Sequence, residues 1–161
     1  MTGVRRGARS VLKYFAPLYV VLIVIQVFLA GEGIFRLHNI SNSDDCNKHG
    51  AAASACLGNS KTLDAHRALG FILTFPGALL FLICALLAWH PNTRVRIVSI
   101  VVAFLTFLQT FLAGIGGFVA GGLHPVNAFI VLGMYGWLTR VLRQEQPESA
   151  GAAASVAVPA G

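Results

Sequence analysis

The sequence predicts an all-α protein, a bundle of four membrane-spanning helices built from two related helical hairpins. Of its 161 residues, 56% are hydrophobic and only 11% are charged, whereas about a quarter of the residues in soluble domains are charged. Several apolar runs reach the roughly 20 residues that a helix needs to cross the hydrocarbon core of a bilayer. A repeated segment indicates that the four helices form two equivalent pairs.

The repeated segment begins at Gln26 and again at Gln109, 83 residues later. Its two copies, QVFLAGEGIF and QTFLAGIGGF, are identical at seven of ten positions. After each copy the chain turns, and a new apolar run opens with a histidine, His66 in LDAHRALG and His124 in LHPVN. Two helices per copy make a parallel repeat, whose pseudo-twofold axis runs along the membrane normal. We therefore expect His66 and His124 at one membrane depth, facing each other.

Local sequence signals predict the bounds of each segment. The predicted segments are a basic head (1–13), four spans (about 14–35, 64–89, 95–119 and 125–143), an outer loop (36–63) and a disordered tail (144–161). Pro76 and Gly77 predict a kink within the second span, which neighbouring helices can tolerate. A short turn is expected at 120–122, and the fourth span is expected to start at Pro125, since proline favours the first helical turn. The tail is of low complexity.

The positions of the charges predict the topology. The formal net charge is +6, and eight of the twelve basic residues lie at alternate ends of the apolar runs: Arg5, Arg6, Arg9, Lys13, Arg94, Arg96, Arg140 and Arg143. By the positive-inside rule, we expect a multi-pass protein of the cell membrane with both termini cytoplasmic and the 36–63 loop outside. The basic balance therefore reflects topology, and no nucleic-acid partner is expected. The first apolar run is long and lacks an A-x-A site, which argues against a cleaved signal peptide.

Two cysteines of the outer loop, Cys46 and Cys56, are expected to form a disulfide, because such bonds persist outside the cytoplasm. Two free thiols, or a metal site that includes His49, are the alternatives. Cys84 lies within a span and is expected to be a small packing residue.

The histidine pair is the main candidate site. Two neutral imidazoles that face each other in a helical bundle can supply both axial bonds of a haem iron. For either histidine alone, the ordinary interpretation is an interfacial residue that caps a helix or meets headgroups. Arg67 follows His66 and is the best candidate to bind a haem propionate, although it could instead extend to lipid headgroups.

The repeat also places small residues near the histidines. Gly31 and Gly33 of the first copy match Gly114 and Gly116 of the second, and glycine would let a flat macrocycle approach the backbone. Close helix packing is the other explanation for these glycines. Five phenylalanines could wall the pocket: Phe28, Phe35, Phe71, Phe111 and Phe118. Gln26 and Gln109 lie one to two turns deeper, where interhelical hydrogen bonds are their simplest role.

With these residues the chain resembles one four-helix half of haem A synthase. The resemblance covers roughly residues 14–143 and rests on the loop cysteines, the His-Arg that opens the second span and the histidine that opens the fourth. It implies that His66 and His124 are axial haem ligands and that Cys46 and Cys56 match the family's loop pair. Leu63 stands where the catalytic half of that family has a glutamate, with Asp64 nearby, so the resemblance implies the half that only holds haem b. The chain is also similar to small four-helix membrane proteins of unassigned role from actinobacteria, through HRALG and HPVNA.

The leading functional hypothesis is a membrane cytochrome that holds one haem b between His66 and His124 near the outer leaflet. Its role would be electron transfer or haem handling, as an accessory subunit of a respiratory complex or with a redox partner or a quinol at the outer face. The alternative is a haem-free structural subunit or assembly factor of a larger membrane complex. A third hypothesis is a small enzyme that acts on haem or quinone, although haem methyl oxidation is disfavoured by Leu63 and by the missing second half.

Overall fold

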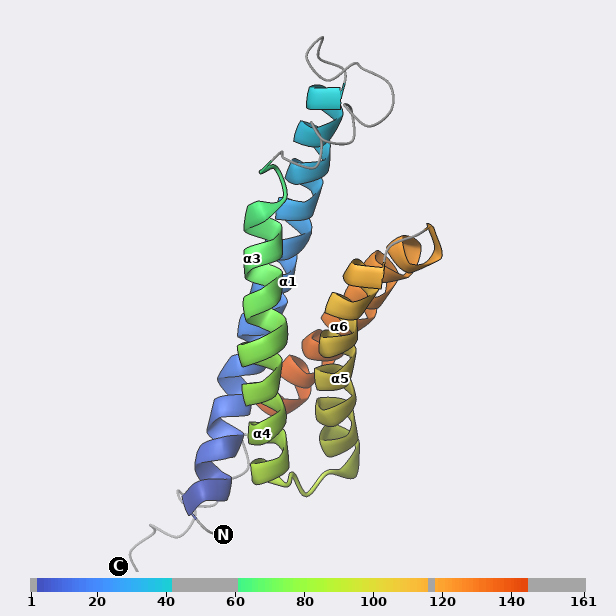
Figure 1. Cartoon of the computed structure of the whole chain (residues 1–161). Helices are drawn as coiled ribbons and strands as arrows, with labels where there is room; N and C mark the ends of the chain where they lie inside the picture. The colour runs from blue at the N-terminus through green and yellow to red at the C-terminus, as the bar shows by residue number, and fades with distance from the viewer. Residues whose placement is uncertain (1–2, 42–60, 116–117, 145–161) are drawn as a thin grey trace, which may run out of the picture.

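The structure, a computed structural model, describes residues 3–41, 61–115 and 118–144. Over these residues it is an all-α bundle of four rods (Figure 1). The rods are α1 (Gly3–Ser41), then α3 (Asp64–Ile72), the π-helical turn η1 (Leu73–Gly77) and α4 (Ala78–Ala88) in one line, then α5 (Thr93–Ile115) and α6 (Phe118–Gln144). The predicted fold class is thereby confirmed.

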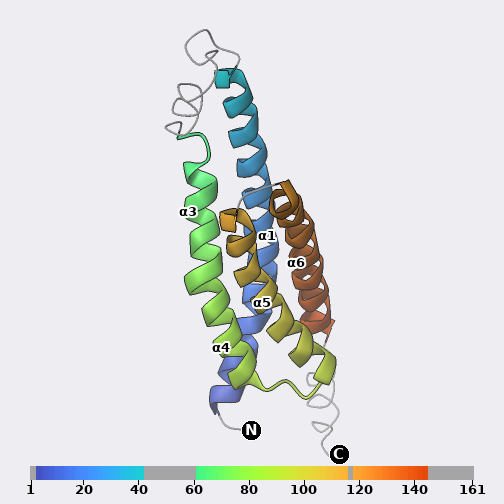
Figure 2. The same ribbon diagram turned by 45° about the vertical axis from the view of Figure 1, so that its right-hand side comes forward.

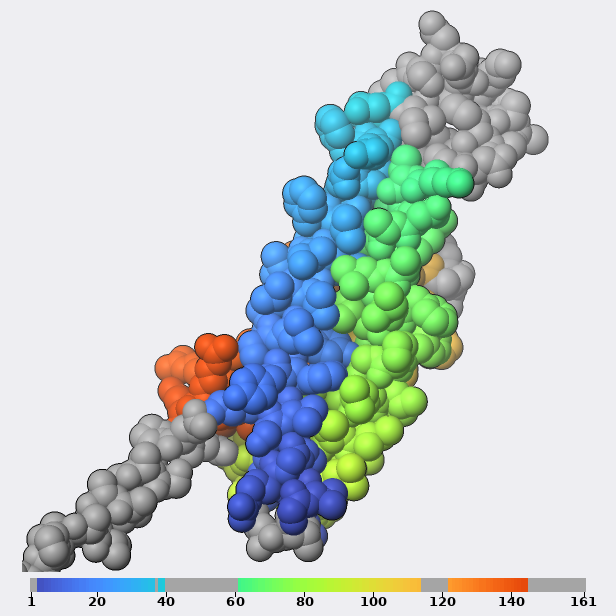
Figure 3. Space-filling model, turned by 90° about the vertical axis from the view of Figure 1, so that its left-hand side faces the viewer, coloured from blue at the N-terminus to red at the C-terminus, as the bar shows by residue number. Residues whose placement is uncertain are grey.

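The rods form two hairpins. One joins α1 to the α3–η1–α4 rod, and Figure 3 shows these two rods side by side along their length. The other joins α5 to α6. Helix α1 begins, and α6 ends, at the end of the bundle that carries the α4–α5 connection, which we call the turn end (Figures 1 and 2). At the opposite end, the open end, the two hairpins diverge (Figure 1).

The four helical rods are long and apolar enough to cross a membrane. The qualifying segments are Gly3–Arg36, Asp64–Ala88, Thr93–Ala113 and Gly122–Gln144. Their outward faces are apolar as well, and on α4 the exposed residues are Leu79, Leu80, Ile83, Leu86 and Leu87. An exposed apolar surface of this extent is suited to lipid and not to water. The chain is therefore a multi-pass membrane protein.

The tightest packing lies toward the turn end, around three aromatic side chains that are at most 2% exposed. The rings of Tyr19 and Tyr135 stack with their centres 4.5 Å apart, and Phe81 meets Tyr135 edge-on at 5.1 Å. Helix α3, at the open end, contains no buried residue. The bundle is thus held together in the turn-end half, and the open-end half is free to enclose a pocket.

At Pro76, where a kink was expected, the structure has a single π-helical turn. Proline has no amide hydrogen and its ring crowds the preceding turn, so a regular α-helix cannot continue through it. Turn η1 widens the helix by one residue there, a common form of insertion near functional sites. The Tyr19 hydroxyl donates a hydrogen bond of 3.0 Å to the Leu73 carbonyl, which begins this turn. The irregular backbone is therefore tied to α1.

Helix α4 ends in a backbone conformation that few side chains adopt. Trp89 has φ 36°, in the left-handed region, and the chain reverses there. The last carbonyls of a helix lack partners within it. Arg9 of α1 provides donors for two carbonyls at this end. Its Nε donates to the Ala88 carbonyl at 3.2 Å and its Nη2 to the Trp89 carbonyl at 3.3 Å. Arg96 covers the Trp89 ring at 4.4 Å.

Replacing Arg9 by Met should destabilise the bundle by about 1 kcal/mol, because both carbonyls lose a charged donor while the apolar stem remains. The measurement is the unfolding midpoint in detergent micelles. Arg5→Met is the matched control, since Arg5 is exposed on the same helix. Equal midpoints for the two variants would contradict a capping role for Arg9.

The helices extend beyond the predicted span boundaries in three places. The basic head is not separate from the first span, because α1 is helical from Gly3 and its Ala8 and Leu12 are buried in the core. Spaced four residues apart, these side chains continue the buried stripe of the helix despite the charges between them. Helix α1 also runs beyond 35, to Ser41. Pro125 lies inside α6, which begins at Phe118, so the turn expected at 120–122 is helical instead.

Candidate functional site

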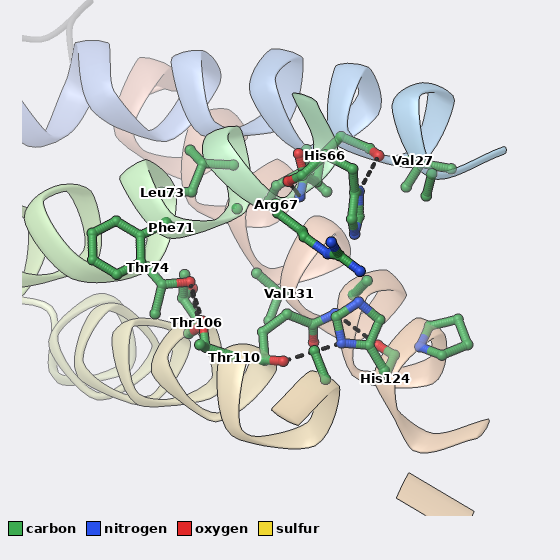
Figure 4. A pocket seen from close by; sticks show the side chains of 18 of the residues that line it. Val27, His66, Arg67, Phe71, Leu73, Thr74, Thr106, Thr110, His124 and Val131 are labelled. Atoms are coloured by element: carbon green, nitrogen blue, oxygen red, sulfur yellow. Dashed lines mark hydrogen bonds between the residues drawn. The ribbon is translucent and has the colours of Figure 1, made fainter. Parts of the chain in front are cut away.

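A cavity of about 480 Å³ lies between the two hairpins, toward the open end (Figure 4). Of the twenty lining residues that the structure describes, eighteen form nine pairs related by the sequence repeat, and Tyr19 and Thr74 are the exceptions. The pairs are Ile23 and Thr106, Gln26 and Gln109, Val27 and Thr110, Ala30 and Ala113, His66 and His124, Arg67 and Pro125, Gly70 and Ala128, Phe71 and Phe129, and Leu73 and Val131. The pocket therefore lies on the pseudo-twofold axis.

Each histidine is fixed by two hydrogen bonds to the glutamine of its own hairpin. Nδ1 of His66 lies 3.1 Å from the Gln26 backbone carbonyl, and the Gln26 side-chain amide donates to the His66 carbonyl at 2.7 Å. His124 and Gln109 repeat this arrangement at 3.1 and 2.8 Å. We call each reciprocal pair of bonds a clamp. The equivalence of the clamps is the clearest structural expression of the repeat.

The clamps determine which ring nitrogen is available to a ligand. A backbone carbonyl can only accept a hydrogen bond, so Nδ1 of each histidine must be the protonated nitrogen that donates it. In the neutral ring, Nε2 then carries the free lone pair. A ligating histidine is commonly oriented in this way, by an outer partner that holds its other nitrogen. Both histidines are thus prepared to bind an electrophile through Nε2.

The two histidine rings approach each other across the pocket, His66 from α3 and His124 from α6 (Figure 4). Their centres are 6.3 Å apart and their planes are inclined at 72°. Nδ1 of His66 faces α1, and Nδ1 of His124 faces α5. Nε2 of each ring is therefore turned away from that helix. Both side chains are half-buried. The expectation that the repeat brings these two residues together agrees with this geometry.

Arg67 is the cation at the pocket. Its side chain extends from α3 toward His124 in Figure 4, and its Nη1 lies 3.7 Å from Asp64 Oδ1. Both side chains are more than half exposed, so this ion pair is weak. Position 125, which the repeat relates to Arg67, holds a proline, and the second hairpin therefore contributes no matching charge.

One wall of the pocket carries hydroxyl groups. Thr110 donates to Thr74 Oγ1 at 2.8 Å, and Thr106 donates to the Val102 carbonyl at 2.7 Å. Thr106 Oγ1 also lies 3.4 Å from the Tyr135 hydroxyl. These hydroxyl groups bond to one another or to backbone carbonyls, and apart from Tyr19, Arg67, the histidines and the glutamines, the other described lining residues are apolar.

The other predicted site residues lie elsewhere. Gly31 and Gly33 do not line the pocket, and Gly33 instead faces Thr62 and Leu63 at the contact between α1 and α3. Ala30 and Ala113 line it in their place. Gly114 and Gly116 fall in the stretch 114–121, whose side-chain surroundings the structure does not describe, and Cys46 and Cys56 lie outside the described residues.

Among the phenylalanines, Phe71 lines the pocket, whereas Phe28, Phe35 and Phe111 are strongly exposed. Phe118 lies within 114–121. The residue that sequence analysis missed is Asn127, which is 6% exposed and donates to Gln109 Oε1 at 2.5 Å and to the Leu105 carbonyl at 2.9 Å. Its place three residues after His124 was the available signal.

Within the described residues, no group of three or more histidine, cysteine or acidic side chains gathers as a metal site would. Comparison of the chain with protein-family models, curated proteins and solved structures finds no match among any of them.

Proposed function

We propose that this membrane protein is a b-type cytochrome that holds one haem between His66 and His124. The observation that carries the proposal is the spacing of the two rings with their Nε2 lone pairs left free. Two imidazoles bound through Nε2 to opposite sides of one metal ion, at about 2.0–2.1 Å each, have ring centres about 6 to 6.5 Å apart. The measured separation of 6.3 Å falls within that range.

The pocket has further properties that suit haem. Its volume of about 480 Å³ lies within the roughly 300–1,000 Å³ of ligand pockets, and its walls are mostly apolar. Haem supplies the other ligands of its iron itself, so His66 and His124 would be the two ligands that the chain provides. Arg67, at the pocket and half exposed, would pair with a propionate. The bound haem would supply one-electron transfer, while the chain orients the ligands and excludes water.

The orientation in the cell membrane is part of the same proposal. The basic residues near the start of α1, after α4 and near the end of α6 all belong to the turn end (Figure 1). By the positive-inside rule the turn end, with both termini, is cytoplasmic and the pocket faces the outer leaflet. A single haem near one face cannot carry electrons across the bilayer alone. A redox partner or a quinol at the outer side would therefore exchange electrons with it, within a larger respiratory complex or beside one.

The test is a dithionite-reduced minus oxidised optical spectrum of the protein purified in detergent after haem supplementation. We expect sharp low-spin b-type bands. In the oxidised protein, ring planes inclined at 72° should give the large-gmax type of low-spin EPR signal that near-perpendicular imidazoles produce. A folded, supplemented protein without haem bands would reject the proposal. It would leave a haem-free structural subunit or assembly factor as the alternative.

A further inference from the structure

The two clamps differ in how their glutamine side chains are held. The amide nitrogen of each glutamine must face a histidine carbonyl, so its Oε1 points the other way and needs a donor. At Gln109 this donor is Asn127, at 2.5 Å. At Gln26, Oε1 is buried and no group in the described residues donates to it.

A single residue difference between the two hairpins explains why Gln109 Oε1 has a donor and Gln26 Oε1 has none in the described residues. Asn127 lies three residues after His124, and the residue three after His66 is Leu69, which has no donor. Asn127 is buried and is bonded at once to Gln109 Oε1 and to the Leu105 carbonyl, so it fastens α6 to α5 beside His124. Leu22, the repeat equivalent of Leu105, receives no such bond, since Leu69 cannot make one.

The helix that carries His66 is also loosely held. Helix α3 contains no buried residue, and it continues into the π-helical turn around Pro76. Breaks of this kind in the α-helical ladder allow the segments on either side to change direction. His66 therefore sits on a segment with few restraints, and its clamp contains a buried polar atom without a partner.

We propose that His124 is the fixed ligand of the haem site and His66 the exchangeable one, so that a small neutral ligand enters on the His66 side. The inference rests on the proposed function. In the exchange, His66 Nε2 would leave the iron and the lone pair of the entering ligand would bind in its place, with no electron transferred. The entering ligand belongs to the class of small lone-pair donors that bind ferrous haem, for which carbon monoxide is the probe.

The experiment gives Gln26 Oε1 a donor in one variant and removes the donor of Gln109 Oε1 in another. Leu69→Asn places a donor where Gln26 Oε1 needs it, and Asn127→Leu takes it from Gln109. We expect carbon monoxide to bind the reduced protein at least about 10-fold more slowly in Leu69→Asn, as outer-shell partners of metal ligands change affinity by about 10- to 100-fold. Asn127→Leu should bind it faster than the parent. Ala68→Asn, exposed on the same helix, is the control for a new amide in α3.

A second readout needs no haem. In the apoprotein, amide hydrogen exchange of residues 64–72 should slow in Leu69→Asn and stay unchanged in Ala68→Asn. Unchanged carbon monoxide rates and unchanged exchange in Leu69→Asn would overturn the inference. If the parent binds no haem, the proposed function fails, and the exchange measurement alone decides whether the two clamps are unequal.

Discussion

His66→Ala and His124→Ala should each lose the low-spin haem spectrum of the parent protein. Each substitution removes one of the two imidazoles whose ring centres lie 6.3 Å apart. Loss of a residue that only supports a metal ligand lowers affinity for the metal by roughly 10- to 100-fold. Retention of low-spin haem should fall by more than that here, because a ligand itself is lost. Optical spectra and the haem-to-protein ratio after gel filtration measure the loss.

The controls separate ligation from folding. His38→Ala should keep the full spectrum, because His38 lies exposed near the end of α1, away from the pocket. In His66→Gly and His124→Gly, added imidazole should restore the low-spin bands by filling the space left by the side chain. Bands that persist in both alanine variants would show that other residues ligate the haem, and the proposed site would be wrong.

Gly77→Ala should destabilise the bundle by about 2 kcal/mol, the second large effect that we expect. A Cβ at Gly77 would collide with the Tyr19 hydroxyl and approach the Ile72 carbonyl at 3.1 Å. Tyr19 would have to move, which would disrupt its bond to Leu73 and its stacking on Tyr135. Unfolding in detergent, followed by circular dichroism, measures the change.

Two variants test whether the collision is the cause. Gly136→Ala should be nearly neutral, since nothing lies within 4 Å of a Cβ built at Gly136. Tyr19→Phe removes the hydroxyl, so adding it to Gly77→Ala should cost less than the sum of the two single substitutions. Additive costs would show that the collision with the Tyr19 hydroxyl is not the reason why Gly77 is required.

The fold class could be predicted because each apolar run is long and because the repeat reports a symmetric arrangement. The pairing of His66 with His124 followed from the same repeat, since two hairpins related by an axis place equivalent residues at one depth. The glutamines, at equivalent positions 26 and 109, were expected to bond between helices. They do so, because each side-chain amide donates to the backbone carbonyl of the histidine on the paired helix.

Other features depend on contacts that no local pattern shows. The charged start of α1 does not resemble a membrane helix, yet it is helical because Ala8 and Leu12 pack into the core. Pro125 carries the usual signal of a helix start, but α6 begins seven residues earlier. The role of Asn127 depends on two acceptors on α5, 18 and 22 residues away in the sequence. Contacts at that separation are not visible in a local pattern.

The single Arg67 has a consequence for how such a site can originate. In a homodimer of one hairpin, every residue near the axis must be self-complementary, because the interface uses the same surface twice. Two copies of the first hairpin would bring two guanidinium groups to one pocket, where like charges repel. Two copies of the second would bring none, since Pro125 stands at that position. Covalent joining of the hairpins into one chain removes that constraint, and a site with one cation and one Asn127 becomes possible.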